Sequence, residues 1–96
     1  MISEVVGSTS IGNTVLVKTK QTTEWHYVYE ESVELISGST EFTYLAEGVF
    51  VYSPAASTSY DASGNGTYEC NYLIIYDDGH MTGTIATTCS IYGKIS

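Results

Sequence analysis

The chain has 96 residues and a formal net charge of −8 at pH 7, with three lysines and arginines against eleven aspartates and glutamates. A chain of this length supplies one apolar core, so we expect a single domain over residues 1–96. The negative charge argues against nucleic acid and anionic lipid as partners, and no apolar run is long enough for membrane insertion.

The composition favours β-structure, because Thr, Tyr, Val and Ile are abundant while strong helix formers are scarce. Short apolar-alternating runs are separated by clusters of Gly, Ser, Asn and Asp, which predicts an all-β, antiparallel β-sandwich or barrel of about seven or eight short strands. The predicted strands, in chain order, are residues 2–6, 14–19, 24–30, 33–36, 41–45, 49–52, 67–76 and 81–92.

The strand predicted over residues 24–30 carries an aromatic row, with Trp25, Tyr27 and Tyr29 at every second position. The alternating positions are mostly polar, so the row is interpreted as the buried face of a half-buried strand. The alternative is an exposed platform on which a sugar ring stacks, and that alternative requires another face of the strand to be buried instead.

Residues 53–66, SPAASTSYDASGNG, contain the only proline and many small residues, which predicts a long loop between the two halves of the chain. A loop of this length inside a small domain is uncommon unless it has a function. This segment is therefore the first place to look for a site.

The end of this segment, DASGNG, resembles the calcium loop of the calmodulin family, D-x-[DN]-x-[DN]-G. The resemblance implies five oxygen ligands, namely the side chains of Asp61, Ser63, Asn65 and Glu69 and the carbonyl of Thr67. The bidentate glutamate of the family is replaced by Tyr72 and no helices flank the loop, so only weak calcium binding is expected. The alternative is a polar turn without a metal, and no other cofactor is expected.

The last two strands flank the sequence DDGH, and the turn type there sets the register of the hairpin. A type II′ turn at Gly79 and His80 places Cys70 opposite Cys89, whereas a type I′ turn at Asp78 and Gly79 leaves the cysteines diagonal. Both registers put the cysteines on the core face, where they form either a disulfide or two buried thiols. A third option is a zinc site formed by Cys70, Cys89, His26 and His80, but these residues lack the close ligand spacing of known zinc motifs.

The run YLIIY, residues 72–76, is apolar on both faces of its strand, because Leu73 and Ile75 alternate with the residues of the cysteine face. A domain this small has few other segments that could pack over the second face of this strand. We therefore expect a neighbouring subunit to cover Leu73 and Ile75, and we expect the chain to form a homo-oligomer or larger assembly.

No catalytic motif accompanies the two histidines and the many hydroxyl side chains, so we expect no enzymatic activity. The favoured function is a structural or interaction module that self-associates in a virus particle, such as a phage capsid-decoration or tail-associated protein, located in the virion or outside the cell. One alternative is a secreted or surface carbohydrate-binding domain that uses Trp25, Tyr27 and Tyr29. Another is a small acidic inhibitor of a host protein.

Overall fold

The computed structural model describes residues 1–77 and 79–96, with Ser53 described by its backbone alone. The described residues form six strands and no helix, and accordingly they contain no helix able to cross a membrane. The strands are β1 (Ile2–Ile11), β2 (Thr14–Val28), β3 (Ser32–Leu45), β4 (Phe50–Tyr60), β5 (Gly66–Tyr76) and β6 (Gly79–Cys89). A bridge between Cys89 and Ile95 adds a short extended segment near the C-terminus.

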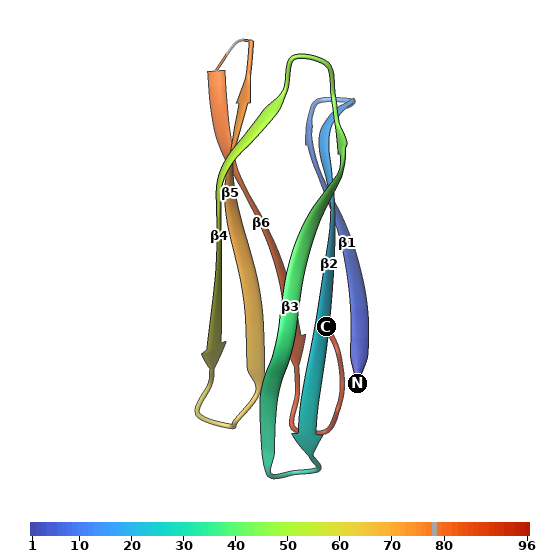
Figure 1. Cartoon of the computed structure of the whole chain (residues 1–96), viewed down its shortest axis with the longest axis vertical. Coiled ribbons are helices and arrows are strands. Elements are labelled where there is room, and N and C mark those ends of the chain that lie inside the picture. Colours follow the sequence, from blue (N-terminus) through green and yellow to red (C-terminus); the bar gives the residue numbers. More distant parts are fainter. Residues whose placement is uncertain (78) are drawn as a thin grey trace.

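The strands form two three-stranded antiparallel sheets, ordered β1-β2-β3 and β4-β5-β6, which pack face to face into an elongated body of 48 × 21 × 19 Å (Figure 1). The predicted all-β fold is confirmed, and of the two predicted architectures the sandwich is the one observed. The strands are longer than predicted, because residues 14–19 and 24–28 belong to one strand, β2, and residues 33–36 and 41–45 to another, β3. The predicted strand over residues 24–30 is two residues too long, since residues 29 and 30 lie in the turn after β2.

The prediction of a long loop over residues 53–66 is wrong, because most of this segment belongs to β4 and only residues 61–65 form a turn. The small residues of β4 are held extended by pairing with β5, from Ala55 opposite Asn71 to Tyr60 opposite Gly66. Pro54 lies at a shift in the register of this edge strand, a position where its missing N–H is tolerated.

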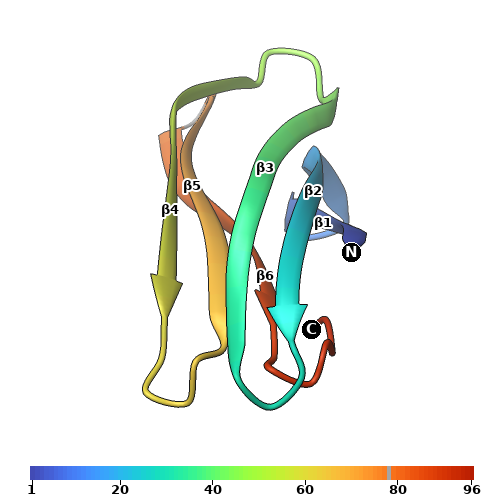
Figure 2. The same ribbon diagram turned by 60° about the horizontal axis from the view of Figure 1, so that its bottom comes forward.

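The two sheets are offset by one strand, so that β3 lies over β5 and β2 lies over β6. Figure 2 shows β4 extending past β3 on one side of the sandwich. As a result, residues 54–60 are exposed on both faces of β4. The Tyr60 hydroxyl accepts a hydrogen bond from the Leu35 N–H at 3.1 Å and ties this overhanging strand to the edge of β3.

Two apolar clusters fill the interior, and a layer of buried polar side chains lies beside them. The larger cluster contains Leu16, Val17, Val49, Cys70, Tyr72, Ile74 and Ile85, and the smaller one contains Trp25, Val33 and Cys89. The buried polar residues are Thr19, Gln21, Thr23 and Thr87. Every buried side-chain nitrogen and oxygen among the described residues has a hydrogen-bond partner, as a stable core requires.

Large aromatic rings in this interior pack directly against glycine backbones. The Tyr72 ring covers Gly83, its cross-strand neighbour, and leaves no room for a side chain there. The Trp25 ring lies against Gly66, where a Cβ would come within 2.7 Å of the indole. Because these glycines have no side chain, the bulky rings fit between the two sheets.

The hairpin of β5 and β6 differs from both predicted registers. Tyr76 pairs with Gly79, and Ile85 is the residue opposite Cys70. The type II′ turn would have placed Cys89 opposite Cys70, and the type I′ turn would have placed Thr87 there. The predicted turn residue Asp78 lies outside the described residues. The observed register differs from each predicted one by an even number of residues, so every side chain keeps its predicted face. The predicted core face is therefore confirmed.

The two cysteines share that core face but are not opposite one another. Cys70 pairs with Ile85, and Cys89 lies four residues further along β6. Four residues of strand span roughly 13 Å, well beyond the Cα separation that a disulfide bridges. Both thiols are free and buried, so of the two predicted states the buried thiols are observed and the disulfide is not.

Candidate functional site

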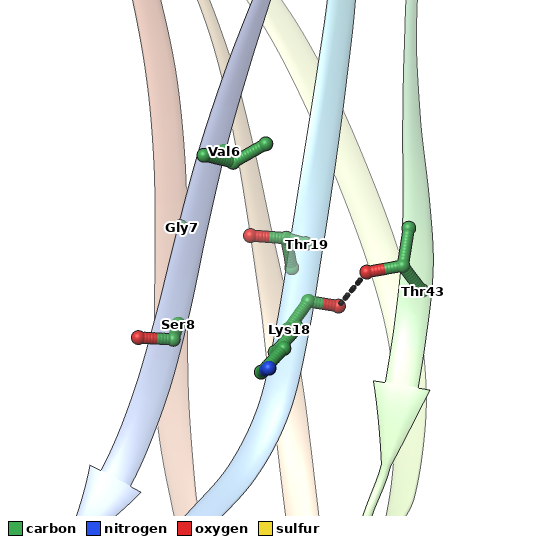
Figure 3. A pocket seen from close by; sticks show the side chains of 6 residues that line it. All are labelled: Val6, Gly7, Ser8, Lys18, Thr19 and Thr43. Atoms are coloured by element: carbon green, nitrogen blue, oxygen red, sulfur yellow. Dashed lines mark hydrogen bonds between the residues drawn. The ribbon is translucent and has the colours of Figure 1, made fainter.

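A shallow hollow of about 330 Å³ opens on the first sheet (Figure 3). Its lining residues come from β1, β2 and β3, and they are Val6, Gly7, Ser8, Lys18, Thr19 and Thr43. Gly7 contributes only backbone to this lining, and a Cβ there would point toward Thr19 and Ile85. Thr43 borders it and donates a 3.4 Å hydrogen bond from its hydroxyl to the carbonyl of Lys18.

The side chains that line this hollow include few groups that could take part in catalysis. Lys18 is the single titratable residue among those that line it, and its ammonium lies 5.8 Å from the centre of the Tyr44 ring. The hydroxyls of Ser8, Thr19 and Thr43 have no carboxylate or imidazole beside them in the lining. A nucleophile and a base are not brought together there, as general acid–base catalysis requires.

The calcium-like segment forms a tight turn around the Asp61 carboxylate. Asp61 Oδ1 accepts hydrogen bonds from the backbone N–H groups of Ser63 at 2.8 Å and Asn65 at 3.0 Å. Asp61 Oδ2 accepts a further bond from the Asn65 side-chain amide at 3.1 Å. These bonds outweigh the effect of desolvation, which by itself raises the pKa of Asp61, and hold that pKa below its ordinary value of 3.8.

The other implied calcium ligands point to different partners. Asn65 Oδ1 accepts a 3.0 Å hydrogen bond from the Ile91 N–H, and Glu69 accepts one at 3.0 Å from the Asn71 side-chain amide. Three or more His, Cys, Asp or Glu side chains do not converge anywhere in the described part of the chain. The carboxylate oxygens of Asp61 thus serve the turn, and an ion there would compete with N–H donors for them.

The outer face of the second sheet carries an apolar patch, which we call the outer patch and define as Phe50, Tyr52, Leu73 and Ile75. Leu73 and Ile75 lie on the face away from the cysteines, as predicted, because the buried Ile74 between them points inward. Phe50 pairs with Ile75 and Tyr52 with Leu73, so the four side chains are direct cross-strand neighbours. The rings of Phe50 and Tyr52 lie 6.4 Å apart.

Sequence reasoning missed Phe50 and Tyr52 as members of this patch. Their alternation with Val49 and Val51 is visible in the sequence, but which face is buried depends on the pairing of β4 with β5. That pairing is a long-range contact, and the sequence around β4 does not specify it.

The aromatic row of β2 divides between the core and the surface. Trp25 has 0% of its surface exposed, so the core interpretation is confirmed for it, and it cannot belong to a ligand platform. The core interpretation is wrong for Tyr29, which is 63% exposed, and Tyr27 is 38% exposed. Tyr29 lies beyond the end of β2 at Val28, in the turn that leads to β3.

Another tyrosine lies beside the exposed end of this row. Tyr92 packs against Tyr29 with ring centres 5.6 Å apart and planes at 70°, and it is 57% exposed. Sequence reasoning placed Tyr92 at the end of a strand, but β6 ends at Cys89 and the following residues turn back. The sequence contains no signal that joins positions 63 residues apart.

The chain matches no known family model, and neither curated proteins nor solved structures include a similar one.

Proposed function

We propose that this protein is a non-enzymatic structural or interaction module that self-associates, in the setting of a virus particle such as a phage capsid-decoration or tail-associated component. The observation that carries the proposal is the outer patch, in which four apolar side chains adjoin on a solvent-facing sheet surface. Contiguous apolar surface on a small protein is typical of a site that another protein covers.

The charge distribution supports a second copy as the partner. Two chains of net charge −8 repel one another unless their contact avoids acidic residues. Residues 50–60, the whole of β4, contain no charged residue. The outer face of the first sheet instead carries several charged residues, most of them acidic, among them Glu4, Lys20, Glu24, Glu34 and Glu41.

The exposed edge of β4 is also free of charged residues, while Glu69 of β5 lies opposite Ser57. Natural proteins protect edge strands with charges, prolines or bulges, and β4 has such protection only around Pro54. Residues 55–59 are all small and exposed, and β4 has a strand neighbour on one side only among the described strands. A second chain that covers the outer patch can therefore also approach this edge.

We include a non-enzymatic role in the proposal, because the sequence contains no catalytic motif. The virus-particle setting is supported by composition, since acidic domains rich in Ser, Thr and Tyr suit symmetric assemblies of β-sandwiches.

Sedimentation velocity from micromolar to millimolar concentration tests the proposal. We expect the native chain to associate as its concentration rises, and we expect Phe50→Glu to shift the population toward the monomer. The matched control is Val6→Glu, which adds the same charge at a side chain that is 77% exposed on the first sheet. A native chain that stays monomeric throughout, or equal effects of the two variants, would contradict self-association through the outer patch.

A further inference from the structure

A second aromatic surface lies at the end of the sandwich where β2 turns into β3. It consists of Tyr27, Tyr29 and Tyr92. We call this surface the tyrosine corner, in a sense distinct from the Greek-key motif of the same name. Figure 1 shows the β2–β3 turn and the loop after β6 at the same end of the molecule. Because the rings of Tyr29 and Tyr92 meet at 70°, their exposed surfaces form an angled corner instead of a flat face.

Hydrogen bonds fasten the turns that carry these rings. The Glu30 N–H donates to the Ile91 carbonyl at 2.9 Å, and the Ile91 N–H donates to Asn65 Oδ1 at 3.0 Å. These bonds join the β2–β3 turn, the β4–β5 turn and the loop after β6. The Ser90 hydroxyl also accepts hydrogen bonds from the N–H groups of Tyr92 and Lys94, at 3.2 and 3.1 Å.

Tyr27 adds to the rigidity of the tyrosine corner by lying against Gly93. A Cβ at Gly93 would come within 2.5 Å of the Tyr27 ring, and the φ of +79° is one that glycine adopts without strain. The exposed rings thus rest on a framework that is already ordered before any ligand arrives. Such pre-organisation lowers the entropic cost of binding.

We propose that the tyrosine corner binds a neutral carbohydrate. A tyrosine ring offers an apolar face for the C–H face of a sugar ring, and its hydroxyl stays available for hydrogen bonds. Three partly exposed tyrosines provide much less surface than the roughly 800 Å² per partner of a typical stable protein interface. The size of the surface therefore suits a small ligand better than a protein.

The charges around the tyrosine corner select against anionic sugars. Glu30 and Glu31 lie in the β2–β3 turn and Asp61 lies in the β4–β5 turn, whereas Lys94 is the basic residue of the loop after β6. This acidic surrounding, on a chain of net charge −8, repels sulfated and uronic polysaccharides. The exposed carboxylates can accept hydrogen bonds from the hydroxyls of a neutral sugar.

This binding site is independent of the proposed self-association. The outer patch begins at Phe50, at the far end of β4 from the β4–β5 turn (Figure 1). An assembly confined to the outer patch would thus leave the tyrosine corner open. Loss of carbohydrate binding and loss of self-association are separately measurable, the first by titration and the second by sedimentation.

NMR titration with cellohexaose and maltohexaose tests the inference, with heparin as the anionic comparison. We expect at least one neutral oligosaccharide to shift the ring signals of Tyr29 and Tyr92. Tyr29→Ala and Tyr92→Ala should each raise the Kd about tenfold, the loss typical of one aromatic anchor. Tryptophan emission is a poor readout here, because Trp25 is fully buried.

Tyr44→Ala is the matched control, because Tyr44 is also an exposed tyrosine but lies near the far end of β3. Tyr29→Phe keeps the ring and should retain binding, which separates ring contact from a general loss of structure. The inference is overturned if neither neutral oligosaccharide binds at millimolar concentration, if heparin binds more tightly than both, or if Tyr44→Ala weakens binding as much as Tyr29→Ala.

Discussion

The Thr87 hydroxyl donates a 2.6 Å hydrogen bond to Gln21 Oε1 between the two sheets, where neither residue has any exposed surface. The amide group of Gln21 in turn donates to the Ile85 carbonyl at 3.2 Å and to the Thr40 hydroxyl at 3.3 Å. These bonds connect β2 of one sheet with β6 of the other. Because buried polar groups are costly without partners, this network favours one alignment of the sheets over others.

Thr87→Val keeps the shape of the side chain but leaves Gln21 Oε1 without its donor. We expect the free energy of unfolding in urea to fall by about 1–3 kcal/mol, the cost of a buried unsatisfied polar group. The control is Thr82→Val, which alters an exposed residue of the same strand and should have little effect. Equal losses in the two variants would show that the Gln21 network does not contribute to stability.

Gly83→Ala introduces a methyl group into space that the Tyr72 ring occupies. We expect the variant to unfold at lower urea concentration, with a loss of about 1–3 kcal/mol from overpacking. Adding Tyr72→Leu, which removes the ring, should make the alanine substitution less costly than it is alone. If the two substitutions are simply additive in a double-mutant cycle, contact between this ring and Gly83 is not the cause.

Stability at acidic pH should depend on Asp61. Hydrogen bonds from the turn favour its ionised form and lower its pKa in the folded chain, so ionisation stabilises the fold. This contribution is present above the unfolded value near 3.8 and is lost as the pH falls through the lower folded value. We expect thermal melts of Asp61→Asn to show a weaker loss of stability over that acidic range than the native chain shows.

The same melts at constant pH, with and without millimolar calcium, examine the calcium-like segment. Since the Asp61 carboxylate is already bonded to Ser63 and Asn65, we expect calcium to leave the melting temperature unchanged. A rise with calcium that disappears in Asp61→Asn would contradict the assignment of this carboxylate to the turn.

Both thiols should be unreactive in the folded chain. Burial raises the pKa of Cys89, an effect that the N-terminal ammonium only partly opposes, so the thiol form dominates at neutral pH. We expect Ellman's reagent to label neither cysteine under native conditions and to label both, Cys70 and Cys89, in denaturant without prior reduction. Labelling that requires a reductant would mean that a disulfide forms, contrary to the observed register.

The side-chain alternation of the strands could be predicted from the sequence, and with it much of the fold. Alternation is local, because each residue of a strand points opposite to its neighbours whatever the rest of the chain does. The inward position of Cys70 and Ile74 and the outward position of Leu73 and Ile75 follow from it. The composition was sufficient for the all-β class, since β-branched and aromatic residues suit pleated sheets.

Only the tertiary structure decided which segments meet. The exposure of residues 54–60 on both faces of β4 follows from the offset of the two sheets. The separation of Cys70 from Cys89 follows from the hairpin register, and the contact of Tyr29 with Tyr92 follows from the fold of the C-terminal loop. These features depend on packing between residues far apart in the chain. Local periodicity sets the direction of a side chain, but the side chain's neighbours are set by the global free-energy minimum.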